Sequence, residues 1–232
     1  MSDSLVKKVH QVEIPVRLDI PAVVRRLRVR GGDGRFDEMM TELAEKARAV
    51  ARPRAVYMTS IVRCVDREHV DVDGVRFTSR VLGRLFHDGE TVYPFITTAG
   101  QELDKLKFPP RDMMMNFSLD AIKTVILVSA VEYLADYLKE KLVLESVAFM
   151  NPGELADWPI SQQQPLFDLF GGEEKQIGVS LTAGGAMRPI KSRSGIVFPD
   201  ATGFLSCRLC TQFKCPGRRA AYDEIIVKEF MS

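Results

Sequence analysis

Hydrophobic and polar positions follow a helical period in four stretches of this chain. Residues 36–51 are amphipathic over about four turns, and residues 21–30 form a short basic helix that starts at a proline. The strongest pattern begins at Ser118, which is predicted to be the N-cap, and continues to Leu142. A shorter helix is expected at residues 165–170. The pattern therefore predicts one long helix accompanied by shorter ones.

Between these stretches, apolar and polar residues alternate or form short β-rich runs. Asp73-Gly74 predicts a tight turn inside one of these runs. The expected strands lie at residues 9–18, 54–64, 69–78, 92–98, 144–149, 177–182 and 194–198. Together with the helices they predict an α+β fold, a twisted antiparallel sheet flanked by helices with one long central helix.

Charge and hydropathy exclude several broad classes. The 232 residues carry a formal net charge of +1, which argues against nucleic-acid binding as the main activity. The most apolar run, Val125 to Val131, is much too short to span a bilayer. The N-terminus shows no apolar stretch of signal-peptide length. We expect a cytoplasmic protein with no membrane partner.

Common catalytic motifs are missing from the sequence. There is no GxxxxGK[ST] loop, no GxSxG elbow and no HExxH pair. The only histidines, His10, His69 and His87, are too far apart to suggest a zinc hydrolase. Generic motifs alone therefore assign no reaction.

Three of the four cysteines crowd together near the C-terminus. Cys207, Cys210 and Cys215 have the spacing CxxCx4C, and Cys64 is a conceivable fourth ligand. Three thiols this close can bind zinc or an iron–sulfur cluster. The alternative is three reduced thiols in a loop-rich tail. Spacing alone leaves both interpretations open.

The C-terminal half carries a more specific signal, in three ordered motifs. They are EYLADYLKEKL (132–142), NPGELADWPISQQQPLFDLF (151–170) and LTAGGAMRPIKSRSGIVF (181–198). In this order and at this spacing, they resemble the activation domain of cobalamin-dependent methionine synthase over residues 115–205. The resemblance divides the chain into an N-terminal α+β portion (1–110), an activation-domain-like core (111–206) and a Cys-containing tail (207–232).

The resemblance implies an accessory function. In that family the module holds S-adenosylmethionine above the corrin, so that cob(I)alamin is methylated as soon as it forms by reduction. The chain would then serve reductive activation of a cobalamin or corrinoid methyltransferase such as methionine synthase, and would not be a catalyst by itself. The implied partners are that corrinoid protein and an electron donor such as a flavodoxin or ferredoxin.

The resemblance also implies ligand-binding residues. Glu132 matches a helix glutamate that contacts S-adenosylmethionine, although Glu132 and Asp136 can equally form a solvated helix face. The turn Asn151-Pro152-Gly153 would present backbone groups to the ligand, or be an ordinary chain reversal. The edge facing the corrin would be formed by Met187, Pro189, Ser192, Ser194 and Gly195, for which an ordinary β-turn is the alternative.

Two positions depart from the family pattern. The arginine expected three residues before Pro152 is Phe149, which removes a carboxylate clamp, and the expected tyrosine pair is replaced by Gly203-Phe204. These departures motivate an alternative function. On the same fold, the chain would be a metal- or iron–sulfur-binding redox or structural protein that no longer binds S-adenosylmethionine.

Overall fold

The computed structural model describes residues 8–28 and 34–231. The α-helices are α1 (Ile20–Leu27), α2 (Gly34–Val50), α3 (Arg80–Leu85), α4 (Met113–Lys141), α5 (Gln163–Phe170) and α6 (Glu224–Met231). The strands are β1 (Val9–Glu13), β2 (Arg54–Met58), β3 (Ser60–Cys64), β4 (His69–Val72), β5 (Val75–Thr78), β6 (Thr91–Thr98), β7 (Val147–Met150), β8 (Ser180–Leu181), β9 (Met187–Arg188) and β10 (Ser192–Pro199). Short 3-10 helices lie at Gln101–Lys105, Ile160–Gln162, Glu173–Ile177 and Ser206–Arg208.

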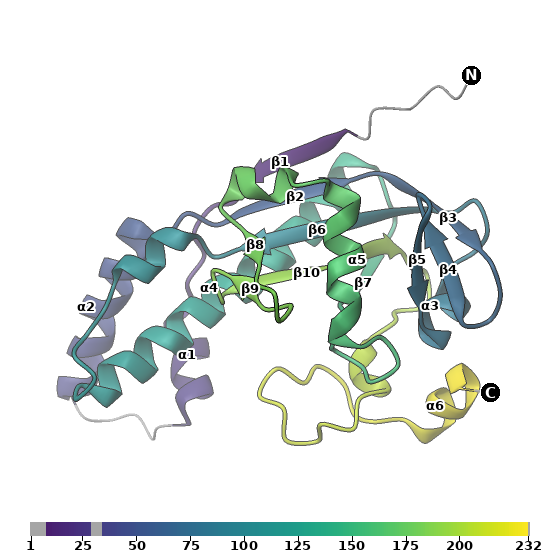
Figure 1. Cartoon of the computed structure of the whole chain (residues 1–232). Coiled ribbons are helices and arrows are strands. Elements are labelled where there is room, and N and C mark those ends of the chain that lie inside the picture. Colours follow the sequence, from purple (N-terminus) through teal and green to yellow (C-terminus); the bar gives the residue numbers. More distant parts are fainter. Residues whose placement is uncertain (1–7, 29–33, 232) are drawn as a thin grey trace.

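Eight of these strands form one antiparallel sheet around β6. On one side, β6 pairs with β2 and then with β3, which continue to β1 and to the β4–β5 hairpin. On its other side, β6 pairs with β10, and β10 pairs with β7. Figure 1 shows α1 and α2 at one end of the sheet and the β4–β5 hairpin at the other. Strands from both sides of residue 110 thus share a single sheet.

Alternation along the strands gives the sheet two apolar faces. Val56 and Ile96 point into a core that α5 covers, whereas their neighbours Tyr57 and Phe95 point into a core on the opposite face, which α4 covers. All four side chains are at most 2% exposed. The predicted α+β fold with an antiparallel sheet and one long helix is confirmed.

The long helix α4 connects the sheet to the helical end of the molecule. Near its start, Leu119 and Ile122 pack against α1 and α2, and near its end Leu134 and Leu138 pack on the sheet. In the described part of the chain, α4 is the one helix long and apolar enough to cross a membrane, yet half of that stretch is buried inside the molecule. It has the packing of a core helix.

The start of α4 differs from the prediction. The helix begins at Met113 after Asp112, and Ser118 is fully buried inside it, so the predicted N-cap is wrong. Pro109 and Pro110 end the preceding segment, and the side-chain amide of Asn116 donates to the carbonyl oxygens of Pro109 and Asp112. The apolar residues before Ser118 therefore belong to the helix.

Other elements differ in detail. The 54–64 run is split into β2 and β3, and 69–78 is the β4–β5 hairpin with its turn at Asp73-Gly74, where both φ angles are positive. The strand predicted at 177–182 is shorter, because a 3-10 helix occupies Glu173–Ile177 and Gly178 follows it at φ 73°. Helices α3 and α6 were not predicted.

Candidate functional site

A cavity lies where the sheet edge is left open beside β10. Strand β7 pairs only with Ile196–Pro199 of β10, so Ser192–Gly195 has a partner on the β6 side alone. The chain leaves the sheet after Met150, and α4, the loop after β7 and the C-terminal tail surround this edge. The uneven lengths of the two strands thus create the space.

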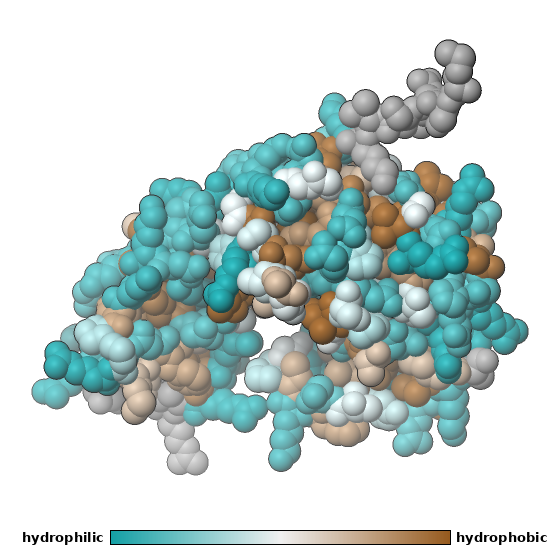
Figure 2. Space-filling model, in the orientation of Figure 1, coloured by the Kyte–Doolittle hydropathy of each residue, from teal (hydrophilic) through white to brown (hydrophobic). Residues whose placement is uncertain are grey.

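The cavity has a volume of about 530 Å³, which lies in the range of small-molecule sites. Apolar side chains line part of it, namely Val128 and Val131 of α4, Phe149 of β7, Ile160 and Met187. Polar and charged groups from the loop after β7, from β10 and from the tail line the rest. Figure 2 shows the surface hollowed between the helical end and the tail, with hydrophobic residues beside the hollow.

Most of the residues predicted from the motifs meet in this cavity. Glu132, Asn151, Pro152, Gly153, Met187 and Ser194 all line it, as do Cys207, Cys210 and Cys215. Pro189, Ser192 and Gly195 do not line it. On α4, Glu132 lines the cavity but Asp136 does not, although both are exposed. The structure therefore separates these two carboxylates.

Close packing explains why position 195 is a glycine, which the sequence alone did not reveal. A Cβ atom there would lie 2.5 Å from the Met150 carbonyl oxygen, 2.6 Å from Asn151 Oδ1 and 2.9 Å from Phe95. Its backbone is ordinary strand, so conformational freedom is not the cause. Glycine lets the loop after β7 approach β10 closely, and so brings Asn151 to the cavity wall.

The turn at Asn151-Pro152-Gly153 is held by its own hydrogen bonds. The Gly153 N–H donates to the Trp158 carbonyl oxygen at 2.7 Å, and the Glu154 N–H donates to the Asn151 carbonyl oxygen at 3.1 Å. The side-chain amide of Asn151 donates to Glu154 Oε2 at 2.6 Å. With its N–H used internally, Gly153 has no free backbone donor to offer to a ligand.

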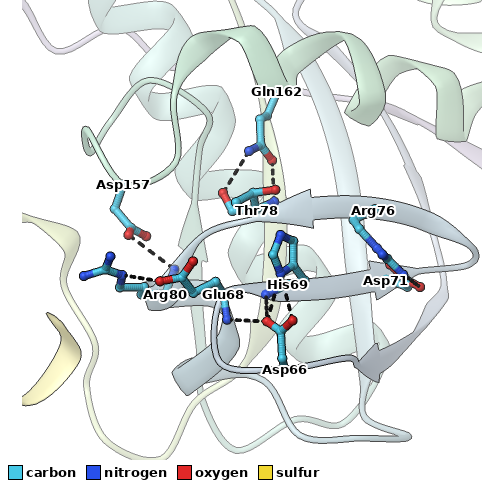
Figure 3. Close-up of polar contacts among 9 residues, drawn as sticks. All are labelled: Asp66, Glu68, His69, Asp71, Arg76, Thr78, Arg80, Asp157 and Gln162. Carbon is cyan, nitrogen blue, oxygen red and sulfur yellow. Dashed lines mark hydrogen bonds and ion pairs between the residues drawn. The ribbon is translucent and has the colours of Figure 1, made fainter. Parts of the chain in front are cut away.

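The remainder of this loop is anchored to α3 and β5, as Figure 3 shows. Asp157 accepts a hydrogen bond from the N–H group of Arg80, at the start of α3. It also accepts hydrogen bonds from the Ser79 hydroxyl and from the N–H group of Val81. Gln162 pairs with the backbone N–H and carbonyl of Thr78 at 2.9 and 2.8 Å. Both ends of the segment are thereby fixed to the scaffold.

Between these anchors, Trp158 is fully buried and packs edge-on against Phe77, with ring centroids 5.9 Å apart. Ser194 extends the same rigid wall, since its buried hydroxyl donates to Gln163 Oε1 at 3.4 Å. Gln163 in turn donates to the Gly185 carbonyl oxygen at 2.8 Å. This side of the cavity is a pre-organised wall, called the sheet wall below.

The other side is formed by residues 206–219, called the tail wall below. The Arg218 guanidinium donates to the carbonyl oxygens of Cys207, Ala220 and Cys210 at 2.7 to 2.9 Å, and so closes the cysteine loop on itself. The Arg219 N–H donates to Cys207 Sγ at 3.4 Å. Hydrogen bonds within the loop shape most of this wall, since Ser206 and Leu209 are the only buried residues among 206–219.

The predicted metal site is not shown. Within residues 8–28 and 34–231, no three His, Cys, Asp or Glu side chains are arranged to hold a metal ion. Cys64 is absent from the cavity wall, and its thiol donates to the Phe86 carbonyl oxygen at 3.4 Å. Burial, with Asp88 and Glu90 nearby, raises the pKa of this thiol. The structure does not bring Cys64 to the other cysteines.

The two departures from the family pattern have different surroundings. Phe204 is buried and contacts Phe198 and Phe230, away from the cavity. Its N–H donates to Asp200, which also accepts from Thr202. Burial alone would raise the pKa of Asp200, but these hydrogen bonds outweigh burial and lower it. The second departure, Phe149, lines the cavity.

The sequence analysis missed several polar residues of the site, among them Arg193, Glu154 and Gln163. Arg193 lies between Ser192 and Ser194 inside the third motif, and Glu154 directly follows the Pro-Gly turn. Their positions within the motifs could have identified them as candidate site residues. The chemistry of the cavity is amphipathic, because an apolar surface lies beside carboxylates, guanidinium groups and thiols.

No family model matches this sequence, and no curated protein matches it either. Among solved structures, the chain is similar to a crystal structure of the MetH reactivation domain bound to AdoHcy. The TM-score is 0.61 at 17% identity, and the match covers 97% of this chain and 89% of that chain. At this identity the likeness establishes the fold alone. This chain therefore has the fold of the MetH reactivation domain.

Proposed function

We propose that this protein is an accessory protein for the reductive activation of a cobalamin or corrinoid methyltransferase such as methionine synthase. In this proposal it binds S-adenosylmethionine in the cavity beside β10 and presents it to the corrinoid of the partner protein. The main support is that residues from all three motifs, far apart in sequence, line one cavity. The fold shared with a domain that was crystallised with AdoHcy also supports it.

The residues present fit such a ligand. The apolar side chains of Val128, Val131 and Phe149 offer a surface for the adenine ring. Glu132 offers a carboxylate for the ligand's ammonium or sulfonium group. When bound, S-adenosylmethionine supplies an activated methyl group. The chain's own contribution is to position the ligand and to exclude water from it.

A second candidate is a metal- or iron–sulfur-binding redox or structural protein that no longer binds S-adenosylmethionine. The observation in its favour is that all three tail cysteines line the same cavity. Metal analysis of anaerobically purified protein distinguishes the candidates. Stoichiometric zinc or iron, without affinity for AdoHcy, would favour this second function.

The activity test uses the complete chain and a cobalamin-binding methyltransferase. The protein should co-purify with that partner in a pull-down. With a reductant and S-adenosylmethionine present, it should convert the partner's cob(II)alamin spectrum to that of methylcobalamin. No interaction and no spectral change would contradict the proposed function.

The binding test compares two carboxylates one helical turn apart. Glu132→Gln should keep the fold and weaken AdoHcy binding by about 1–3 kcal/mol, the range for a charge-assisted contact. Asp136→Asn is the matched control, because Asp136 is exposed on the same helix but does not line the cavity. Equal affinities of the two variants in calorimetry would assign Glu132 to a solvated face.

A further inference from the structure

Two guanidinium groups from distant parts of the chain lie against the ring of Phe149. The Arg193 group, from β10, is 5.5 Å from the ring centroid, and the Arg219 group, from the tail wall, is 4.9 Å from it. Contact with an aromatic face orients a guanidinium without using its N–H donors. Apart from one long contact of Arg193 with Glu154, the donors of both arginines therefore stay available beside the cavity, which both residues line.

Carboxylates neutralise Arg193 and Arg219 only weakly. Arg193 reaches Glu154 Oε1 at 3.5 Å, longer than the roughly 2.7–2.9 Å of a strong charge-assisted bond. The other oxygen of Glu154 accepts from Asn151. Among the described residues, no carboxylate pairs with the Arg219 guanidinium, which contacts the Phe149 ring. Glu154 is thus a weak partner for Arg193.

Arg218 makes a useful contrast with its neighbour. Its guanidinium donates to three backbone carbonyl oxygens and is committed to the shape of the tail wall. Arg219 has no comparable structural task for its side chain. The two adjacent arginines therefore differ, in that one builds the wall and the other is free to bind.

Partial burial makes Arg193, though not the exposed Arg219, more responsive to an anion. Burial is the largest influence on the pKa of Arg193 and lowers it, Glu154 opposes this shift, and the nearby charge of Arg219 adds to it. An anion between the two groups would relieve their repulsion and replace lost hydration. The position and the charge both favour an anionic ligand group.

We propose that Arg193 and Arg219 form an anion subsite that binds the carboxylate of the ligand's amino-acid end. This inference rests on the proposed function, since S-adenosylmethionine and AdoHcy carry a carboxylate and an ammonium group on one carbon atom. Phe149 then has a structural role, because its ring packs against the two guanidinium groups and orients them. The tail wall contributes a binding residue as well as closing the cavity.

The test compares AdoHcy with its decarboxylated analogue, 5′-(3-aminopropylthio)-5′-deoxyadenosine, by calorimetry on the full chain. The analogue keeps the adenosyl, thioether and ammonium groups and lacks only the carboxylate. The variants are Arg193→Met and Arg219→Met, which keep an apolar stem and remove the charge. Arg188→Met and Lys214→Met are the controls, because both residues are exposed near the site and do not line the cavity.

The wild-type protein and both controls should bind AdoHcy about 10- to 100-fold more tightly than the analogue. Each arginine variant should lose most of that preference while keeping the wild-type affinity for the analogue. A variant that keeps the preference for AdoHcy, or that binds both ligands equally more weakly, would overturn the subsite and leave the proposed function intact. A wild-type protein that binds neither compound would overturn both.

Discussion

The two walls of the cavity are built in different ways. The sheet wall rests on fully buried side chains such as Trp158 and on a glycine packed against backbone at Gly195. The tail wall rests on hydrogen bonds of Arg218 to its own loop, and the α6 helix that follows has no fully buried residue. We infer that the sheet wall shares the stability of the whole fold, whereas the tail wall opens locally.

This difference suits the proposed function, in which the site holds one ligand and contacts a partner protein. A rigid wall keeps binding groups in place before the ligand arrives, which limits the entropy lost on binding. A wall held by local hydrogen bonds can open at a smaller free-energy cost than unfolding. The comparison predicts that substitutions in the two walls affect different measurements.

The largest effect is expected at Trp158. Trp158→Ala should lower the free energy of unfolding by about 3–5 kcal/mol, because it empties a fully buried site against Phe77. Trp158→Phe should cost less, since the Trp158 Nε1 group has no hydrogen-bond partner among the described residues. Urea denaturation measures both variants. A loss below about 1 kcal/mol for Trp158→Ala would show that this loop is not part of the cooperative core.

A smaller effect is expected at Gly195. Gly195→Ala should destabilise the protein by about 1–3 kcal/mol, because the new methyl group would contact the Met150 carbonyl oxygen at 2.5 Å. Gly184→Ala is a suitable control, since a Cβ there meets nothing within 4 Å. Thermal denaturation of the two variants gives the comparison. Equal melting temperatures would show that the close approach of Asn151 to β10 is not required.

The smallest global effect is expected at Arg218. Arg218→Ala should leave the unfolding transition nearly unchanged, while alkylation of Cys207 and Cys210 becomes about 10- to 100-fold faster, because three hydrogen bonds that close the loop are lost. Lys214→Ala controls for the removal of a charge from the same loop. If Arg218→Ala lowers global stability as much as Gly195→Ala does, the two walls form one cooperative unit.

Periodicity predicted the sheet and α4 because their burial follows a repeat along the chain. Residues such as Val56 and Tyr57 alternate between the two faces, and this pattern is visible without a structure. The predicted start of α4 was wrong. The helix already begins at Met113, and its first residues include exposed apolar side chains that the sequence pattern did not assign to the helix. Composition does not distinguish exposed from buried methionine.

The candidate site was only partly predictable for a different reason. Motif positions such as Glu132 and Ser194 came from the family resemblance, and in the structure both line the same cavity. The contacts of Phe149 with Arg193 and Arg219 join residues far apart in sequence, which no local pattern reveals. From the sequence alone, Phe149 in place of the expected arginine therefore indicated the loss of a carboxylate clamp. The structure shows two other arginines beside the Phe149 ring.

The most direct test of the account is ligand protection of the tail thiols. Saturating AdoHcy should slow the alkylation of Cys207, Cys210 and Cys215, measured residue by residue by mass spectrometry. Cys64, which does not line the cavity, should react at an unchanged rate and serves as the internal control. Protection of the three tail cysteines alone is the predicted result. Unchanged rates at all four cysteines, with AdoHcy present at saturation, would contradict a ligand enclosed between the sheet wall and the tail wall.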